Sequence, residues 1–335
     1  MGKQDVAPEV VVVTGASAGV GRATAVSFAK RGARLGLLAR GREGLEGAKR
    51  EVESAGGKAL AIPTDVSNPD AVEAAAQQVE EKLGPMDVWV NNAMVSVFSP
   101  AEQMGPEEYK RVTEVNYLGT VYGTLAALKH MLPKNRGHIV QVGSALAYRG
   151  IPLQSAYCGA KHAIQGFTES LRSELLHDRS NVQLTMVQMP ALNTPQFGWV
   201  RSRLPGKPQP VPPIFQPEVA AEAIYWAAHH GRDELWVGWP AVKAIVGNRI
   251  FPRALDRYLA RTGYDSQQTD EPADLENRKD NVFEALDDTE DYGTYGSFDD
   301  RSLDKSYQWW ADVHRSWLVA GAALAGLAGA ALVRR

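Results

Sequence analysis

Short runs of apolar, often β-branched residues alternate with longer amphipathic stretches from Glu9 to about Pro240. The short runs show no polar alternation, which is typical of strands buried on both faces. We expect strands at Val10–Thr14, Arg34–Ala39, Lys58–Pro63, Asp87–Asn91, Gly137–Gly143, Val182–Met189 and Leu235–Val237. We expect helices at Gly21–Arg31, Gly44–Ala55, Asp70–Leu83, Pro106–Met131, Ser155–Asp178 and Pro217–His229.

Strands separated by helices of this length predict right-handed βαβ crossovers and a parallel sheet covered on both faces. The predicted fold class is therefore α/β, a Rossmann-type doubly wound parallel sheet in three αβα layers. We assign it to residues 8–240.

Three further segments interrupt or follow this alternation. Residues 193–217 are too long and too rich in proline for an ordinary connection, and we expect a substrate lid loop there. Residues 241–264 predict a helical extension interrupted at Pro252, and residues 265–304 an acidic, poorly ordered linker. Aromatic residues in that linker could anchor it on the main body: Phe283, Tyr292, Tyr295 and Phe298.

Residues 305–335 predict a terminal apolar helix. Its run Trp317–Val333 carries no charge and has 17 residues, near the minimum for a bilayer span, for which about 20 are typical. Trp309 and Trp310 before the run are typical of an interfacial belt. Alanines and glycines three or four apart would equally allow close helix packing. Membrane contact and docking on the catalytic domain or a second subunit therefore both stay open.

Charge is spread unevenly along the chain. Residues 265–304 carry 14 acidic residues against three basic ones, although the formal net charge of the whole chain is −3. The rest of the chain therefore has a positive excess, which suits a phosphate-bearing cofactor, whereas no basic run is dense enough to indicate nucleic acid. A single cysteine, Cys158, excludes an intrachain disulfide and fits a reducing compartment. We expect a cytoplasmic protein, with membrane association depending on the terminal helix.

The segment Thr14–Gly21 lies between the first expected strand and the first expected helix. A pyrophosphate needs backbone N–H donors at close range and a helix N-terminus directed at it. Gly15, Gly19 and Gly21 permit the tight turn and the close approach. A glycine-rich turn can also serve only a backbone with positive φ, but its position between strand and helix favours nucleotide binding.

The residues after the second expected strand indicate the cofactor. A dinucleotide without a 2′-phosphate usually meets an acidic residue here, about 20 residues past the glycines. This chain has neutral Ala39 followed by Arg40, with Arg42 and Arg22 nearby. Guanidinium groups match a phosphate with paired donors and permanent charge, so we expect NADP(H). One or more of these arginines could instead be ordinary surface charges, and for Arg42 we prefer that interpretation.

Tyr157 and Lys161 lie four apart in an expected helix and share one face. A free tyrosine has a pKa of about 10, and a nearby cation brings it toward the working pH for general acid/base catalysis. Ser144 ends the preceding strand, at the sheet edge where ligands bind. A Tyr and a Lys at this spacing are commonly only helix surface, but their occurrence with the glycine loop and Ser144 favours a catalytic set.

These motifs together resemble the short-chain dehydrogenase/reductase family, in its single-domain branch, from Val10 to about Val237. The resemblance implies that Asp65 contacts adenine, that Asn91-Asn92-Ala93 supports the sheet beside the cofactor, and that Lys161 also binds the nicotinamide ribose. It implies that Asn116 holds a water for proton relay and that Thr194 lies near the nicotinamide carboxamide. The expected catalytic residues are Asn116, Ser144, Tyr157 and Lys161. The expected cofactor-binding residues are Gly15, Ser17, Ala18, Gly19, Val20, Gly21, Arg40, Asp65, Val66, Asn92, Ala93, Tyr157, Lys161, Pro190 and Thr194.

Two positions depart from the family pattern. Met94 and Ala191 stand where the family usually has glycine. Both leave the catalytic residues in place and put the shape of the cleft in question. We expect the Met94 side chain to face the cofactor region or the substrate cleft.

The expected activity is reversible hydride transfer between NADP(H) and a carbonyl/alcohol pair, with Tyr157 as general acid/base. Apolar residues after Thr194 favour a partly apolar small-molecule substrate: Phe197, Trp199, Val200 and Leu204. We expect a homo-oligomer, no metal and no nucleic-acid partner. The alternative is a non-catalytic NADP(H)-binding sensor or scaffold protein tethered by its tail. Loss of Ser144, Tyr157 or Lys161 would have favoured it, and all three are present.

Overall fold

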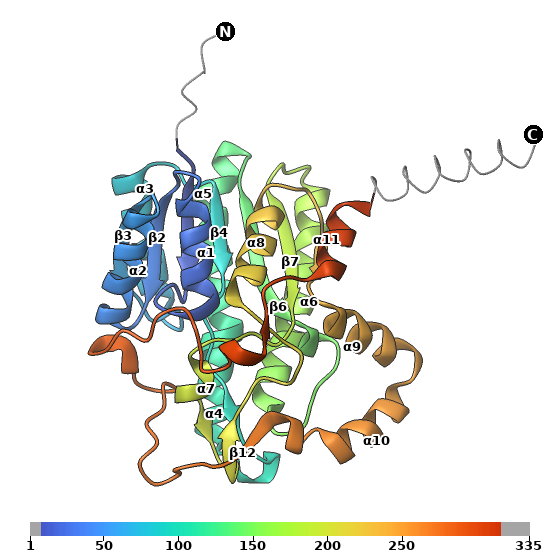
Figure 1. Cartoon of the computed structure of the whole chain (residues 1–335). Coiled ribbons are helices and arrows are strands. Elements are labelled where there is room, and N and C mark those ends of the chain that lie inside the picture. The colour runs from blue at the N-terminus through green and yellow to red at the C-terminus, as the bar shows by residue number, and fades with distance from the viewer. Residues whose placement is uncertain (1–7, 316–335) are drawn as a thin grey trace, which may run out of the picture.

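The centre of the structure is a seven-stranded parallel sheet in the order β11–β7–β6–β4–β1–β2–β3 (Figure 1), in a computed structural model that describes residues 8–315. This order confirms the predicted doubly wound α/β fold. The chain reverses its direction of travel across the sheet between β1 and β4, where a crevice forms at the carboxyl ends of the strands. The strands are β1 Val10–Thr14, β2 Arg34–Ala39, β3 Lys58–Pro63, β4 Val88–Asn91, β6 His138–Ser144, β7 Gln183–Met189 and β11 Glu234–Trp236.

Strand β1 shows how both faces of the sheet are buried. Val11 and Val13 join the apolar cluster under α1, α2 and α8, while Val10 and Val12 join the cluster under α3, α5 and α6. Successive side chains of a strand point to opposite faces, so an uninterrupted apolar run requires a helical layer on each side. The layers comprise α1 Gly19–Ala29, α2 Arg42–Ser54, α3 Pro69–Leu83, α4 Pro106–Val112, α5 Gly119–Met131, α6 Ser155–His177 and α8 Pro217–Ala228.

The expected long helix over residues 106–131 is divided. A π-helical turn at Thr113–Leu118 separates α4 from α5. A π-turn inserts an extra residue into the helix, and such turns occur frequently at functional sites. The apolar pattern of a π-helical turn is too similar to that of an α-helix for the sequence to indicate where the turn lies. Asn116 lies within this turn.

The proline-rich loop is built into small sheets with the C-terminal extension. It contains α7 Gln196–Trp199, β8 Arg201–Ser202, β9 Gly206–Pro208 and β10 Ile214–Phe215, and β8 pairs with β5 Val97–Phe98. β9 pairs antiparallel with β12 Gln268–Pro272, and β10 pairs parallel with β13 Ser302–Leu303. The loop is therefore held from two sides by chain that follows it.

The C-terminal extension begins with α9 Trp239–Ile250 and α10 Pro252–Thr262, two helices that meet where the interruption at Pro252 is expected. The acidic residues that follow differ from the expected poorly ordered linker. They run back across the catalytic domain, visible in orange and red in Figure 1. Val282 is fully buried in the apolar cluster under α3, α5 and α6.

Two of the four expected aromatic anchors of this segment are packed against the body. Phe298 is buried in edge-to-face contact with Phe197, and Tyr292 lies edge-to-face on Trp199. Phe283 and Tyr295 are exposed. Apolar contacts that are far apart in the sequence thus hold a segment whose own composition resembles a disordered chain.

The described chain ends shortly after α11 Tyr307–Val313. The run Trp317–Val333, for which membrane contact was one expectation, lies outside the described residues. Within residues 8–315, none of the helices combines the length and the apolar character that crossing a bilayer requires.

Burial of Val282 gives a direct test of the attachment of the acidic segment. Val282→Ala should lower the free energy of unfolding by about 1–2 kcal/mol, because it removes two buried methyl groups and leaves a cavity. Leu275→Ala is the matched control, since Leu275 lies in the same segment and is 50% exposed, and it should change stability by less than about 0.5 kcal/mol. Urea denaturation measures both. Equal effects of the two variants would contradict the packed position of Val282.

Candidate active site

The loop between β1 and α1 lies against the chain that leaves β4. Gly15 and Gly19 have φ of +65° and +54°, a conformation that side chains with a Cβ rarely adopt. A Cβ on Gly15 would lie 2.8 Å from Cα of Ala93. This close approach brings the glycine loop and the N-terminus of α1 to the crevice, where a diphosphate would bind, and in this structure the Gly19 N–H donates to the Gly293 carbonyl. These residues therefore fit a dinucleotide.

Hydrogen bonds join the two loops. Oγ1 of Thr14 accepts from the backbone N–H groups of Asn92 and Ala93, at 2.9 and 3.0 Å. The Asn92 amide donates to the Thr14 carbonyl at 2.9 Å. Gly21 completes the junction, because a Cβ there would lie 2.1 Å from the Gly15 carbonyl oxygen. The role of Gly21 in this structure is packing, and it does not line the pocket.

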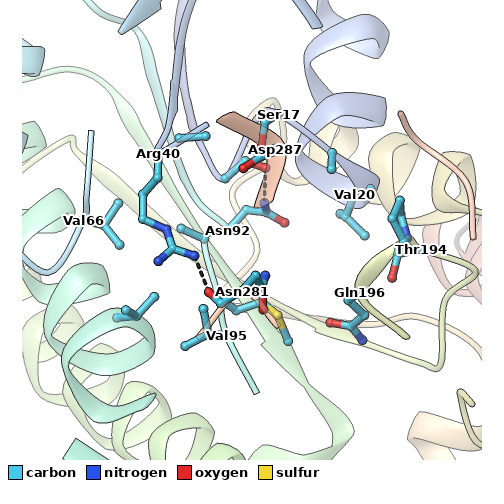
Figure 2. A pocket seen from close by; sticks show the side chains of 18 of the residues that line it. Ser17, Val20, Arg40, Val66, Asn92, Val95, Thr194, Gln196, Asn281 and Asp287 are labelled. Atoms are coloured by element: carbon cyan, nitrogen blue, oxygen red, sulfur yellow. Dashed lines mark hydrogen bonds between the residues drawn. The ribbon is translucent and has the colours of Figure 1, made fainter. Parts of the chain in front are cut away.

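A pocket extends along this crevice (Figure 2) and contains most of the expected cofactor-binding residues. The expected residues that line it are Gly15, Ser17, Ala18, Gly19, Val20, Arg40, Asp65, Val66, Asn92, Ala93 and Thr194. Met94 lines it too, so its side chain faces the cofactor region. Gly21, Pro190, Tyr157 and Lys161 are not among its lining residues.

Several lining residues were missed by the sequence interpretation. Gln196 comes from the proline-rich loop, and Asn281 and Asp287 come from the acidic segment. No sequence signal indicates the last two, because they follow the catalytic domain in a segment without secondary-structure periodicity. Tertiary folding alone brings them to the pocket.

Arg40 lies at the pocket as expected, but its donors are already engaged. Its guanidinium donates to the backbone carbonyls of Asn281, Val282 and Phe283, with the Phe283 contact at 3.1 Å. Burial and the neighbouring Arg111 lower its pKa below the ordinary arginine value. Figure 2 shows Arg40 reaching the backbone of Asn281.

The other two arginines considered for the phosphate have different roles. Arg22 is 3% exposed and pairs with Glu51 at 2.8 Å and with Asp291. It therefore fixes the acidic segment to α1 and α2 and does not line the pocket. Arg42 is exposed, which agrees with its expected role as an ordinary surface charge.

Asp65 is bound by a residue that the sequence interpretation did not identify. Arg111 on α4 donates to the Asp65 carboxylate and to Oγ of Ser67, both at 2.6 Å. Burial opposes ionisation of Asp65, but hydrogen bonds from Arg111 and Ser67 outweigh it and hold the pKa below the ordinary value. Asp65 is therefore an ionised carboxylate held in place by Arg111, and it lies at the end of the pocket lined by the residues that follow β2 and β3.

Ser144, Tyr157 and Lys161 lie together at the carboxyl end of β6 and the start of α6. Ser144 lies close to the Tyr157 hydroxyl, and its Oγ accepts from the Leu146 N–H at 3.1 Å. Nζ of Lys161 donates to the Val142 carbonyl at 2.6 Å and lies 5.5 Å from the centre of the Tyr157 ring. The structure thus brings the expected serine, tyrosine and lysine into one cluster.

The pKa of Tyr157 shifts in the direction opposite to the expectation. Burial raises the pKa of Tyr157 above the ordinary value, and the neighbouring Ser144 hydroxyl offsets only part of this effect. Burial lowers the pKa of Lys161 to about 8, so its ammonium stays mostly charged at neutral pH. The ammonium is directed at Val142 and not at the phenol oxygen. In the protein by itself, Tyr157 therefore holds its proton.

The side chain of Asn116 is bonded to the chain that follows β4, and its expected role in holding a water stays a prediction. Its Oδ1 accepts from the Val95 N–H at 2.8 Å, and its Nδ2 donates to the Val95 carbonyl at 2.9 Å. The Asn116 carbonyl accepts from Oγ1 of Thr120 at 2.8 Å. The side chain thereby fixes the chain after β4, and Val95 lines the pocket.

Three of the four apolar residues expected to contact substrate lie elsewhere. Phe197, Val200 and Leu204 belong to a buried cluster with Phe298 of the acidic segment. Only Trp199 of this set lines the pocket. Their apolar character reflects packing between the proline-rich loop and the C-terminal extension, so that part of the substrate prediction was wrong.

The sheet, the glycine loop and the Ser144–Tyr157–Lys161 cluster define an oxidoreductase that uses a nicotinamide dinucleotide. The model of the short chain dehydrogenase family matches residues 9–203, and the chain belongs to that family. The chain is 36% identical over 267 residues to the uncharacterized oxidoreductase YxnA of Bacillus subtilis, a match that covers 79% of this chain and 75% of the relative. It is 30% identical to a fatty acyl-CoA reductase of Acinetobacter baylyi, over 67% of this chain and 74% of the relative.

Solved structures agree with this assignment. A metagenomic short-chain oxidoreductase in complex with NADP superposes with a TM-score of 0.58 at 29% identity. The match covers 70% of this chain and 98% of the metagenomic enzyme. This chain therefore carries additional structure beyond what the metagenomic enzyme shares with it.

Gly15 offers a test of the loop junction. Gly15→Ala should lower the free energy of unfolding by about 1–3 kcal/mol, because the added methyl meets Ala93 and φ is positive. Gly166→Ala is the control, since Gly166 lies inside α6 with open space around it. That variant should be neutral or stabilising by up to about 1 kcal/mol, as expected for glycine replaced in a helix. Thermal or urea unfolding compares the two, and a Gly15 variant as stable as wild type would exclude the close approach.

Proposed function

We propose that this protein reduces a carbonyl compound, or oxidises the corresponding alcohol, by hydride exchange with NADP(H). The observation that carries the proposal is the position of Ser144, Tyr157 and Lys161 at the carboxyl end of β6, two strands from the glycine loop after β1. Hydride transfer requires both parts at the same sheet edge, because the cofactor and the proton donor must meet at one substrate.

NADP(H) is proposed over NAD(H) because no acidic residue directly follows β2. Arg40 lines the pocket in the place where an NAD-type carboxylate would be expected. The NADP complex of the metagenomic relative supports the same choice. When bound, the cofactor supplies the hydride. The residues of this chain bind the cofactor and the substrate and donate or accept the proton.

In the reducing direction, the Ser144 hydroxyl donates to the substrate oxygen, since its Oγ already accepts from the Leu146 N–H. Tyr157 then gives its proton to the same oxygen. The phenol carries its proton at neutral pH, as a proton donor must, but burial raises its pKa and makes it a weaker acid unless the phenolate is stabilised. The Lys161 ammonium stabilises the phenolate that remains. Asn116 positions Val95 at the pocket wall.

The proposed substrate class rests on the lining of the pocket and on the name of one relative. Trp199 and Met94 give the pocket apolar wall. The fatty acyl-CoA reductase among the relatives is named for a substrate with an apolar chain. We therefore propose a partly apolar carbonyl compound, and NADPH consumption with a panel of apolar ketones and aldehydes identifies it. No turnover with any member would favour the sensor or scaffold alternative.

Removal of the Tyr157 hydroxyl tests the chemistry. Tyr157→Phe should lower kcat by at least about 10²–10⁴-fold, the usual contribution of a general acid, and leave the Kd for NADPH within about two-fold. Tyr122→Phe on α5 is the control, because among residues 8–315 its hydroxyl has no hydrogen-bond partner, and it should keep full activity. Stopped-flow turnover and fluorescence titration measure the two quantities. Substantial turnover by the Tyr157→Phe variant would remove Tyr157 from the mechanism.

Reversal of the Arg40 charge tests the cofactor. Arg40→Asp should weaken NADPH binding by about 1.5–3 kcal/mol, or roughly 10- to 150-fold in Kd, and leave NADH binding unchanged or improved. Arg42→Asp makes the same charge change at an exposed neighbour and should have a small effect on both cofactors. Isothermal titration with each cofactor gives the answer. A wild-type protein that prefers NADH would contradict the NADP(H) assignment.

A further inference from the structure

The acidic strap, residues 279–293, crosses the pocket at the end where Arg40 lies. It carries six carboxylates against one lysine. Two anchors fix it to the catalytic domain: the fully buried Val282 at one end and the Asp291–Arg22 ion pair at the other. The N–H of Asn281 also donates to the Trp199 carbonyl at 3.2 Å, and the Gly293 carbonyl accepts from the Gly19 N–H at 3.2 Å.

Backbone carbonyls of the strap accept hydrogen bonds from the Arg40 guanidinium. Three successive carbonyls, of residues 281–283, accept from its two terminal nitrogens. Five N–H groups belong to a guanidinium, and these three contacts occupy both terminal nitrogens, so Arg40 cannot present those two nitrogens together to a phosphate. Arg40 must turn away from the strap before it can bind a 2′-phosphate with both nitrogens.

The strap also places carboxylates around the same position. The Asp287 carboxylate lies on the α2 N-terminus so closely that a Cβ on Gly41 would be 2.0 Å from its Oδ1. A Cβ on Gly44 would be 2.8 Å from Oδ2 of Asp287 and 2.9 Å from Cβ of Ser17, so Asp287 and Ser17 face the same space. Asp288 accepts from the first helical N–H, that of Arg42, at 3.2 Å.

Arg40, Ser17 and Asp287 all line the pocket (Figure 2). An N-terminal helix amide and a guanidinium are groups that favour an anion. In this structure the anions present are side chains of the protein's own strap. A phosphate dianion bound at Arg40 would meet the Asp287 carboxylate as a like charge.

We propose that the acidic strap competes with the 2′-phosphate of the cofactor for Arg40 and the α2 N-terminus. The strap thereby sets the preference between NADP(H) and NAD(H). This inference rests on the proposed function, because it presumes a dinucleotide in the pocket. NADP(H) binds only when Arg40 leaves the strap carbonyls and Asp287 withdraws. NAD(H), which lacks the phosphate, binds with the strap in place.

The part of the strap between its anchors is suited to this movement. Phe283, Glu284, Asp288, Thr289 and Glu290 are exposed, and none of them belongs to a buried apolar cluster. Local release of residues 283–290 costs polar contacts, the contact of the Phe283 ring with the Arg201 guanidinium and the partial burial of Leu286. It leaves Val282 buried and Asp291 paired with Arg22. Segments with few buried apolar contacts are those that open at low free energy.

Charge removal at Asp287 tests the competition. In Asp287→Asn the Kd for NADPH, and that for 2′,5′-ADP, should fall about three- to ten-fold, the size expected for one like charge at partly solvated range. The Kd for NADH should change by less than about two-fold. Asp270→Asn is the matched control: Asp270 is exposed on β12 in the same extension, has no ion pair within residues 8–315, and loses the same charge. Isothermal titration of the full chain measures all three ligands.

Hydrogen exchange tests the movement in the wild-type protein. Amides of residues 283–290 should exchange faster with saturating NADPH than without it, and NADH should leave their exchange unchanged. Amides of β1 serve as the internal reference.

The outcomes separate this inference from the proposed function. If wild type binds neither NADPH nor 2′,5′-ADP, the cofactor assignment fails. If wild type binds NADPH, but Asp287→Asn matches Asp270→Asn, or NADPH slows exchange in residues 283–290, the strap does not compete. In that case the cofactor assignment stands and the competition is overturned.

Discussion

The close approach of the β1–α1 loop to the chain leaving β4 is the contact on which the site depends. Gly15 can lie against Ala93 only without a Cβ, and Thr14 then accepts two N–H groups from the opposite segment. Because β1 and β4 flank the point where the sheet order reverses, this contact both opens the crevice and fixes its width. Asn116 extends the same junction by holding Val95 from the π-helical turn.

Mutual packing orders two segments that would not fold alone. The proline-rich loop and the acidic extension each lack an apolar face long enough for a core. Together they form two small sheets and a buried cluster in which Phe197 meets Phe298. Ion pairing adds a constraint, since the buried Arg22 would lack a compensating charge if Asp291 and Glu51 were absent. The extension is therefore a structural part of the catalytic domain and a wall of its pocket.

Burial determines the protonation of Tyr157 in the cluster with Ser144 and Lys161. Tyr157 keeps its proton because a phenolate in this position would lose solvation, and Lys161 is directed at a carbonyl. The same principle acts at Asp65, where Arg111 and Ser67 keep a carboxylate ionised despite burial.

The sequence by itself determined the sheet, its covering helices and the motifs at strand ends. The bounds of β1, β2 and β3 agree with expectation to the residue, because uninterrupted apolar runs between turn residues leave one periodicity to follow. The glycine loop, Ser144 and the Tyr157–Lys161 pair were recognisable for a similar reason: each is defined by neighbours within a few positions. Local patterns also indicated where the regular alternation stops.

Only the tertiary structure decided the partners of the charged residues. Arg40 meets Asn281 across 241 positions, and Arg22 meets Asp291 across 269. Asp65 accepts a hydrogen bond from Arg111. Phe197, Val200 and Leu204, which follow Thr194, pack into a buried apolar cluster. An arginine is equally compatible with a phosphate, a carbonyl or a carboxylate, so its sequence position does not select among them. The partner of each arginine is decided by folding, which places one acceptor within hydrogen-bond distance and keeps the other acceptors farther away.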